Sequence, residues 1–414
     1  MPSPARRLLL SSGILVTLSF GAGFARAADT SFSEIEKGRY LATAGDCTAC
    51  HTTSKGAYLS GGLPIKTPFG LIYSPNITPD RDTGIGNWSK DEFYNAIHHG
   101  VRPDGKRLYP AFPYPYFTKL TRDDVDAIYA YLKTVKAVSA KTQAPELTWP
   151  LNYRIVMRGW DWMFFKPGTY KANSAKSAEW NRGAYLVEGA AHCGACHTPK
   201  NIAGAAKTDE KLHGDRLQNW FAPNLASKGR ASLAQWSVDD IVEYLQTGRN
   251  RHSGATGLMS EVVEKSTSKL SRDDLRAMAV YLKDITSQPA PLSPSTPDPS
   301  VMATGKRIFE TSCAACHRKD GTGVPRMFPP LAKSALVHSR NPTTIIRMIL
   351  KGARTAATNA APTHSAMPAY DWKLSDDEIA AVATYVRNSW GNAAPSISPA
   401  DVASLRKDLA SRNQ

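Results

Sequence analysis

Three short stretches of the chain, GDCTACH, AHCGACH and TSCAACH, each combine two cysteines with a histidine, and all six cysteines fall in them. The residues are Cys47, Cys50 and His51, then Cys193, Cys196 and His197, and finally Cys313, Cys316 and His317. Two thiols at this spacing can add to the vinyl groups of a porphyrin, and the histidine that follows can bind its iron. The pattern predicts three covalently bound haem c groups, with these histidines as proximal ligands.

Two other uses of paired cysteines fit less well. A structural zinc site commonly combines two paired clusters, whereas each pair here stands alone in its own part of the chain. A redox pair of the thioredoxin type would accompany a βαβ pattern, and the sequence shows none. Three occurrences with no cysteine outside them favour haem attachment.

A haem that transfers electrons usually takes a methionine as its second axial ligand, which raises its potential. Met367 lies in SAMPAY, before the segment that Leu374 opens, and Met259 lies in TGLMSEV, at the matching place before Leu270. Both methionines are expected on loops in the same position of a repeat. Met259 and Met367 are therefore predicted distal ligands of the second and third haems.

The first motif has no methionine in that position. Phe112 stands there instead, in LYPAFPYPYF, and apart from the first residue no methionine precedes Met157. Either Met157 or Met163 folds back onto the first haem, or His98 or His99 supplies a second histidine ligand, or the iron stays five-coordinate. The methionines are slightly favoured, with Met157 as the candidate ligand.

The motifs belong to a threefold repeat. Each unit opens with a glycine-containing segment and closes on a matching one, LTRDDVDAIYAYL, LSRDDLRAMAVYL or LSDDEIAAVATYV. In the closing segments a serine or threonine is followed at the spacing of a capping box by an acid, and apolar residues then recur at helical spacing. The corresponding residues are Gly38, Gly183 and Gly305 in the opening segments, and Thr121, Ser271, Ser375, Tyr131, Tyr281 and Tyr385 in the closing ones. We expect each glycine to let the closing helix approach closely, with the tyrosine packed beside it.

The repeat predicts an all-α fold of three tandem domains, each with one covalently bound haem. The domains are expected at residues 28–140, 176–286 and 301–392. The remaining segments are a signal peptide at 1–27, an aromatic linker at 141–175, a Pro/Ser-rich linker at 287–300 and a C-terminal tail at 393–414.

The first 27 residues predict export. They combine a basic start at Arg6 and Arg7, an apolar middle and a small-residue cleavage site at Ala25-Arg26-Ala27. The apolar run is short for a bilayer crossing, which needs about 20 residues. We expect an exported protein on the periplasmic side of the cytoplasmic membrane, soluble or peripherally bound.

The two other special segments differ in character. The aromatic linker contains LNYRIVMRGWDWMFFKPG, which either packs between the first two domains or docks a partner subunit, and both alternatives remain open. The tail SPADVASLRKDLASRNQ, residues 398–414, is a candidate helix that is weakly amphipathic, and we expect it to be a solvated end.

The charge of the chain is strongly basic. The formal charge of +15 falls to +12 without the three arginines of residues 1–27, which hold no acid. The remaining basic residues are scattered, with no arginine-rich arm, so nucleic acid is a poor candidate partner. An acidic protein or an anionic membrane face fits better.

With its haem motifs, signal peptide and the signatures LYPAFPY, APNL and SAMPAY, the chain resembles the tri-haem cytochrome c subunit of bacterial membrane-associated dehydrogenases. That family serves alcohol, gluconate, sorbitol and fructose dehydrogenases. The resemblance implies three cytochrome c domains and a large PQQ- or flavin-dependent dehydrogenase subunit as partner, with a small third subunit as a further candidate. It also implies that electrons pass from haem to haem towards membrane ubiquinone or a terminal oxidase.

Two other functions compete with this one. A peroxidase-like haem enzyme would use an open-coordinate first haem, and Phe112 is the feature that favours it. A free-standing periplasmic shuttle would have no dedicated dehydrogenase. The sequence shows no dinucleotide fingerprint, no Gly-x-Ser-x-Gly and no His-Glu-x-x-His, which favours an electron-transfer subunit without substrate chemistry of its own.

Overall fold

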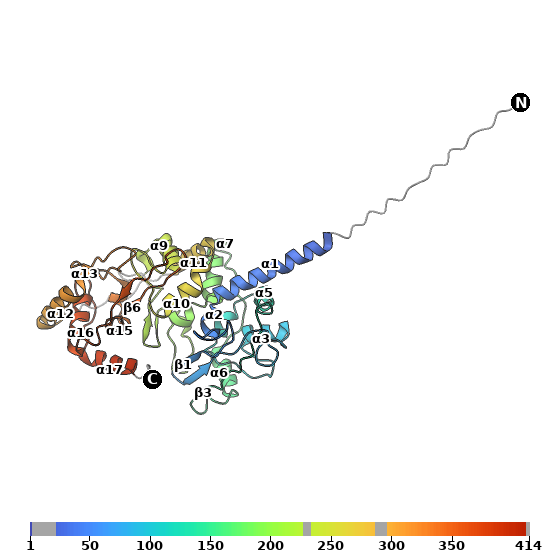
Figure 1. The fold of residues 1–414 in the computed structure, drawn as a ribbon, viewed down its shortest axis with the longest axis horizontal. Coiled ribbons are helices and arrows are strands. Elements are labelled where there is room, and N and C mark those ends of the chain that lie inside the picture. Colours follow the sequence, from blue (N-terminus) through green and yellow to red (C-terminus); the bar gives the residue numbers. More distant parts are fainter. Residues whose placement is uncertain (2–21, 227–232, 286–295, 411–414) are drawn as a thin grey trace.

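The computed structural model describes Met1 and residues 22–226, 233–285 and 296–410. Most of the predicted signal peptide and of the Pro/Ser linker therefore lies outside the described residues. The units that contain the three motifs are called the first, second and third unit below. They follow one another along the long axis of the molecule, with the third unit at the left in Figure 1 and the first at the right.

Each unit is framed by a pair of helices that pack closely on each other. The first unit pairs α1 (Ala22–Ala44) with α5 (Arg122–Leu132), the second pairs α7 (Ala178–Tyr185) with α11 (Arg272–Asp284), and the third pairs α12 (Pro299–Ser312) with α16 (Asp376–Arg387). The three closing helices begin where the capping pattern predicts, because Thr121, Ser271 and Ser375 each accept a hydrogen bond from the backbone N–H at the third helical position. The expected caps are confirmed.

The predicted close approach at the glycines is also confirmed. A Cβ atom added to Gly38 would lie 1.8 Å from the carbonyl oxygen of Ala127. The same atom on Gly183 would lie 1.9 Å from the oxygen of Ala277, and on Gly305 2.2 Å from that of Ala381. Any side chain at these positions would overlap the backbone of the closing helix. In the third unit Tyr385 packs beside the glycine as expected.

Further helices, turns and short strands complete each unit. The first unit adds α2 (Cys47–His51), β1 (Pro64–Thr67), β2 (Gly70–Tyr73), α3 (Lys90–His99) and α4 (Tyr114–Phe117). The second unit adds the π-helical turn η1 (Leu186–Ala190), α8 (Gly194–His197), the 3-10 turns η2 (Thr208–Glu210), η3 (Leu233–Gln235) and η4 (Thr267–Lys269), β4 (Asp215–Leu217), β5 (Trp220–Ala222), α9 (Val238–Thr247) and α10 (Leu258–Lys265). The third unit adds α13 (Ala314–His317), α14 (Ala335–His338), α15 (Thr343–Lys351), β6 (Ala353–Arg354), β7 (Ala366–Met367) and α17 (Pro399–Ala410).

The fold is largely helical, as predicted, but it is not purely so. Each unit contains a short antiparallel hairpin: β1 with β2, β4 with β5, and β6 with β7. Strand β3 (Glu146–Leu147), from the aromatic linker, adds to β2. These strands are two to four residues long, which is too short for an alternating pattern to stand out in the sequence.

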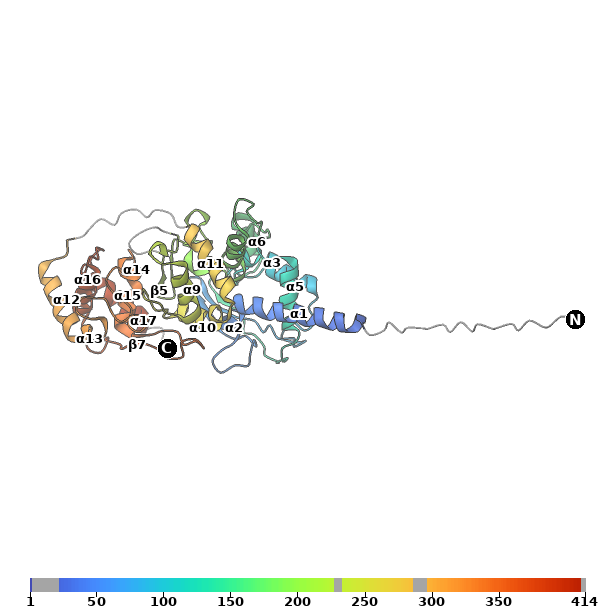
Figure 2. The same cartoon turned by 90° about the horizontal axis from the view of Figure 1, so that it is seen from above.

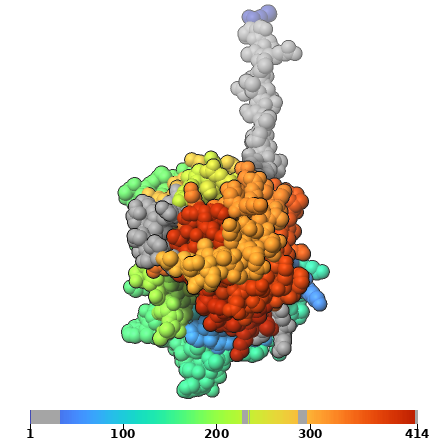
Figure 3. All heavy atoms as spheres, turned by 90° about the vertical axis from the view of Figure 1, so that its left-hand side faces the viewer, coloured from blue at the N-terminus to red at the C-terminus, as the bar shows by residue number. Residues whose placement is uncertain are grey.

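Two large hydrophobic cores form the interiors of the units, and two smaller clusters lie between units. One core is continuous across the first and second units, since it joins Leu41 and Val125 to Leu186 and Leu275. The other lies within the third unit, which forms the orange and red face in Figure 3.

The C-terminal tail was expected to be a solvated end, and that expectation is wrong. Helix α17 buries Val402, Leu405 and Leu409 in the core of the third unit, where it packs on α15 and α16. Three apolar side chains on one stripe of a short helix are enough to dock it, although most of its other residues are exposed.

The aromatic linker forms helix α6 (Val156–Phe164), which is apolar on two faces. Met157 and Trp160 are buried, and the Trp160 indole N–H donates to the carbonyl oxygen of Ala203 at 2.9 Å, so this face packs between the first and second units. On the other face Ile155 is 62 %, Trp162 86 % and Met163 58 % exposed. Figure 2 shows α6 at the edge of the molecule.

None of the described helices combines the length and apolarity that a bilayer crossing requires.

Candidate haem-binding sites

The three motif histidines share one arrangement. The Nδ1 atom of His51 lies 2.7 Å from the carbonyl oxygen of Pro75, that of His197 2.8 Å from Pro223, and that of His317 3.1 Å from Pro329. A carbonyl only accepts, so Nδ1 carries the proton and the Nε2 lone pair is left for a metal. Burial lowers the pKa of all three imidazoles, which keeps them neutral. A neutral histidine whose Nδ1–H is held by a carbonyl presents its Nε2 atom in the form that binds iron.

The motif cysteines lie on the single helical turns α2, α8 and α13 or on the residue directly before the turn. Burial raises the pKa of Cys47 and Cys193 to about 12 and that of Cys313 to about 11. A redox-active thiol needs the opposite, a lowered pKa that favours the thiolate. The raised pKa of Cys47, Cys193 and Cys313 therefore disfavours disulfide exchange as the role of the motif cysteines.

The two predicted distal methionines do not lie on loops. Met259 is in the first turn of α10, which begins directly after Gly257, a residue with a φ of 59°. The start was missed because α10 lacks a side-chain cap. Met367 is in β7, where it pairs with Ala353. Both side chains are partly buried against the core of their own unit. Their role as ligands stays a prediction, and their expected loop positions are corrected.

At the first motif the candidate distal ligands lie in different surroundings. Met157 is buried among Tyr109, Tyr114 and Trp160, and Phe112 packs both on this cluster and on the core that contains Cys47. The Phe112 ring therefore packs against both the Met157 cluster and the core next to Cys47. Met157 stays a predicted ligand of the first haem.

The other candidates differ sharply in exposure. Met163 is 58 % exposed, which disfavours it. His98 is buried, its ring stacks on Tyr94, and its Nδ1 has no hydrogen-bond partner within the described part of the chain. A second histidine ligand at the first site therefore remains open.

Comparison with known proteins decides the family. The model of the family described as Cytochrome c matches residues 35–136 and 302–390. The cytochrome c subunit of a quinone alcohol dehydrogenase from Gluconacetobacter polyoxogenes is 41 % identical over 95 % of this chain and 89 % of its own length. The gluconate 2-dehydrogenase cytochrome c subunit of Pantoea cypripedii is 39 % identical over 95 % and 94 %, and the fructose dehydrogenase cytochrome subunit of Gluconobacter japonicus is 35 % identical over 90 % and 82 %.

The chain belongs to the family of dehydrogenase cytochrome c subunits. This confirms the family that the sequence resembles, and covalently bound haem c is the cofactor that the family implies. Members of this family are named as cytochrome c subunits of dehydrogenases, in keeping with an electron-transfer subunit rather than a catalytic one. Within the described residues, no three Cys, His, Asp or Glu side chains gather as a protein-only metal site would need.

In this cytochrome c subunit the first and second motifs lie against each other. The ring Nε2 of His192, next to Cys193, is 3.1 Å from the carbonyl oxygen of Gly45, two residues before Cys47. The Phe117 ring, at the end of α4, packs edge-on against His192 with ring centroids 5.1 Å apart. The first two sites are therefore neighbours within one core.

The proline carbonyls are the functional atoms that the sequence analysis missed. A signal was present for two of them, because SPN and APN place Pro75 and Pro223 at matching positions after their motifs. The third, Pro329, lies in FPP and breaks that pattern.

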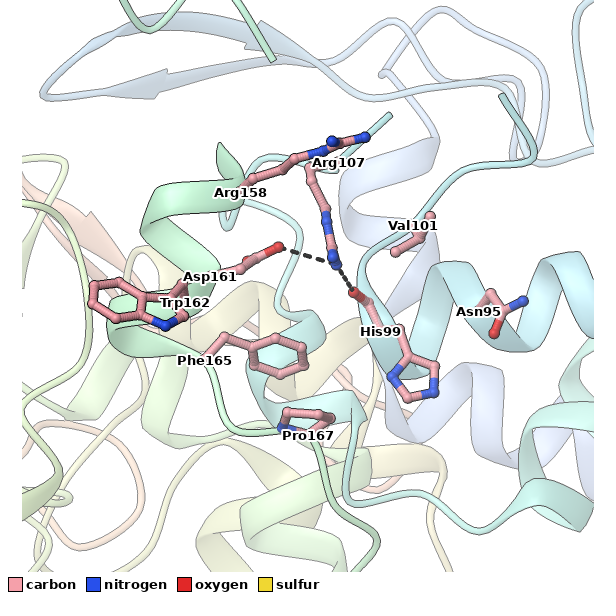
Figure 4. Close-up of a pocket in the computed structure, with 9 residues that line it drawn as sticks. All are labelled: Asn95, His99, Val101, Arg107, Arg158, Asp161, Trp162, Phe165 and Pro167. Atoms are coloured by element: carbon pink, nitrogen blue, oxygen red, sulfur yellow. Dashed lines mark hydrogen bonds and ion pairs between the residues drawn. The ribbon is translucent and has the colours of Figure 1, made fainter. Parts of the chain in front are cut away.

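A cavity of about 580 Å³ opens beside the exposed face of α6. Figure 4 shows Arg107 between the Asp161 carboxylate and the carbonyl of His99, at 3.2 and 3.1 Å, with Trp162 and Arg158 at the rim. Asp161 also accepts a 2.5 Å hydrogen bond from the Tyr114 hydroxyl. Burial raises the pKa of Asp161, and the ion pair with Arg107 offsets part of that cost.

Proposed function

We propose that this chain is a tri-haem relay that carries electrons from a dehydrogenase subunit towards the membrane. The observation that carries the proposal is the same histidine–proline contact in all three units. The second unit lies outside the two segments that the family model matches. Its Gly183 contact, its capped closing helix and the His197 contact support a third domain of the same kind.

The residues have separate roles in such a relay. The cysteines tether the haems, the proline carbonyls hold His51, His197 and His317 with Nε2 free, and Met259 and Met367 complete the second and third sites. Haem c supplies the reversible one-electron chemistry. The contact between the first two motifs would keep the distance for electron transfer between the first two haems short. The protein's part is to fix the positions of the haems and to exclude water from them.

The partner would be a large subunit that oxidises an alcohol, sugar or sugar acid at PQQ or flavin, and the acceptor would be ubiquinone or a terminal oxidase. The basic start and small-residue site of residues 1–27 support export to the periplasmic side of the cytoplasmic membrane. The net positive charge supports peripheral binding to that membrane's anionic face.

The exposed face of α6 is proposed as the surface that docks the dehydrogenase subunit. Six of the twelve exposed large hydrophobic side chains lie at positions 149, 153, 155, 162, 163 and 164. Two tryptophans, a tyrosine, a phenylalanine and a methionine are the residue types that centres of protein interfaces favour. Arg158 at the cavity rim has no ion-pair partner among the described residues, so it would face an acidic group.

The relay is tested by counting haems. The chain, produced in a host that matures c-type cytochromes, should stay red after acid–acetone extraction, and its mass should include three haems. The double variant Cys193→Ala and Cys196→Ala should lose one haem mass and keep the other two. A mass with fewer than three haems in the unaltered chain would overturn the proposal.

A further inference from the structure

The contact between the second and third units joins the two segments that carry the predicted distal methionines. Thr256, three residues before Met259, forms an antiparallel bridge with Thr355, in the segment between β6 and β7. The backbone N–H of Ala356 donates to the carbonyl of Ala255 at 3.1 Å. The N–H of Ala357 donates to the Glu264 carboxylate, on α10, at 2.8 Å.

One arginine of the second unit reaches across this contact. Arg249, directly after the Gly248 that ends α9, donates from Nη2 to the carbonyl oxygens of Ala361 at 3.1 Å and Thr363 at 2.6 Å. Its Nη1 lies 3.4 Å from the carbonyl oxygen of Arg326. Thr363 is four residues before Met367. A single guanidinium therefore holds carbonyls of the distal segment and of the segment between His317 and its Pro329.

Arg249 contacts the part of the distal segment that lacks regular structure. Residues 355–365 contain neither a helix nor a named strand, and β6 and β7 pair over only two residues each. The two ends of the segment are tied together, because the backbone N–H of Thr355 donates to the carbonyl of Ser365 at 2.9 Å, and Thr358 pairs with Ala361 between them. Hydrogen bonds from a charged donor are stronger than neutral ones, and the planar fork of arginine binds two carbonyls in a set geometry.

We propose that Arg249 is a positioning residue for the third haem site. By fixing the carbonyls of Ala361 and Thr363 it holds the segment that presents Met367, so that iron ligation in the third unit depends on a side chain of the second. The inference rests on the proposed function, because it takes Met367 as a ligand.

The test uses the holoprotein and the absorption band that reports a methionine–iron bond. The absorbance that Met367→Ala removes from this band is the contribution of the third site. In the unaltered protein this absorbance is lost on alkaline titration, and in Arg249→Gln and Arg249→Lys we expect the midpoint of that loss about one pH unit lower. Such a shift corresponds to a roughly tenfold weaker ligation of iron by Met367. Haem content and helical circular dichroism should be unchanged.

Two comparisons separate positioning from other effects. Glu243→Gln removes the ion pair between Glu243 and Arg326, which spans the same contact away from the distal segment, and it should leave the midpoint unchanged. Arg249→Lys keeps the charge but loses the fork. A shift in Arg249→Gln alone would indicate a charge effect and overturn the positioning role.

The remaining outcomes distinguish the two proposals. An unchanged midpoint in both Arg249 variants would overturn this inference and leave the relay intact. If Met367→Ala left the band unaltered, the ligand assignment itself would fall, and the inference with it. Arg249→Lys is the milder change and keeps the test available if Arg249→Gln does not mature.

Discussion

At the scale of residues, the donors and acceptors around each histidine decide what it can bind. The cysteines and histidines could be predicted because covalent haem attachment leaves a local pattern of residue types. The carbonyls of Pro75, Pro223 and Pro329 could not be predicted in the same way, because a backbone oxygen has no residue type and each lies 12 to 26 residues along the chain from its partner. The first site shows the same limit, since only packing separates the exposed Met163 from the buried Met157 and His98.

Arg387 is the largest fully buried side chain in the described part of the chain. Its guanidinium donates to the carbonyls of Val337, Ser339 and Pro395, and burial lowers its pKa to about 10. Arg387→Leu would leave these three acceptors unpaired, so we expect a loss of about 3 kcal/mol or more in the free energy of unfolding. Urea titration followed by circular dichroism measures it.

Arg307→Leu is the matched control, because Arg307 is exposed on α12 of the same unit. It should change the free energy of unfolding by less than about 0.5 kcal/mol. Equal effects of the two substitutions would show that the buried hydrogen bonds contribute nothing specific.

Asp240 links stability to pH. Burial raises its pKa, but hydrogen bonds from Ser237, Arg251 and His252 outweigh burial and hold the pKa at about 2. An unfolded aspartate has a pKa of about 3.9, so the stabilisation is complete above that value and is lost as the pH falls towards 2. The stability difference between the unaltered protein and Asp240→Asn should therefore shrink between about pH 4 and pH 2.

Urea titrations at several pH values measure that difference. Asp239→Asn serves as the control, since the Asp239 side chain is 76 % exposed and pairs with Arg272 at 3.5 Å. Its effect on the free energy of unfolding should be small, because the side chain is exposed. A pH-independent difference for Asp240→Asn would contradict the assigned hydrogen bonds.

At the scale of elements, helices were predicted best where caps and periodicity agree, as at Thr121, Ser271 and Ser375. Helix α10 was missed because it starts on Gly257 without a side-chain cap, and the docking of α17 was missed because only three apolar residues carry it. The hairpins depend on contacts between segments and on turns, and short strands leave no periodic signal. The features that the sequence did not predict, namely α10, the docking of α17 and the hairpins, therefore depend on tertiary packing.

The glycine contacts give a prediction at this scale. In Gly183→Ala the new methyl group would overlap the carbonyl of Ala277, so α7 and α11 must separate, and we expect a loss of about 1–3 kcal/mol in the free energy of unfolding. Gly159→Ala is the opposite case, because no atom lies within 4 Å of a Cβ at that position of α6. It should be neutral or stabilise by up to about 1 kcal/mol.

Denaturant unfolding of the two variants under identical conditions compares these effects. A destabilisation of similar size in both would show that the helix interior, and not the contact between helices, disfavours alanine.

At the scale of the whole molecule, the exposed face of α6 predicts how the subunit assembles. Trp162→Ala should weaken binding to the dehydrogenase subunit at least about tenfold, since exposed tryptophans at the centre of an interface carry much of its binding energy. The haem spectra should not change. Trp372→Ala, a substitution of a 79 % exposed tryptophan in the third unit, is the control and should bind normally.

The affinity of both variants is measured by titrating each of them over the purified dehydrogenase subunit immobilised on a surface. Full affinity in Trp162→Ala would exclude α6 as the docking surface. A loss in Trp372→Ala alone would move the interface to the third unit.

The division into two hydrophobic cores has a consequence for how such a chain can change during evolution. The first and second units bury their apolar side chains against each other, so truncating the chain between them would expose the apolar side chains of both. The third unit keeps its own interior and is closed by its own terminal helix. Recombination at the linker could therefore exchange the third unit without opening the core that the first two share, provided that the new unit keeps the contacts that Arg249 makes.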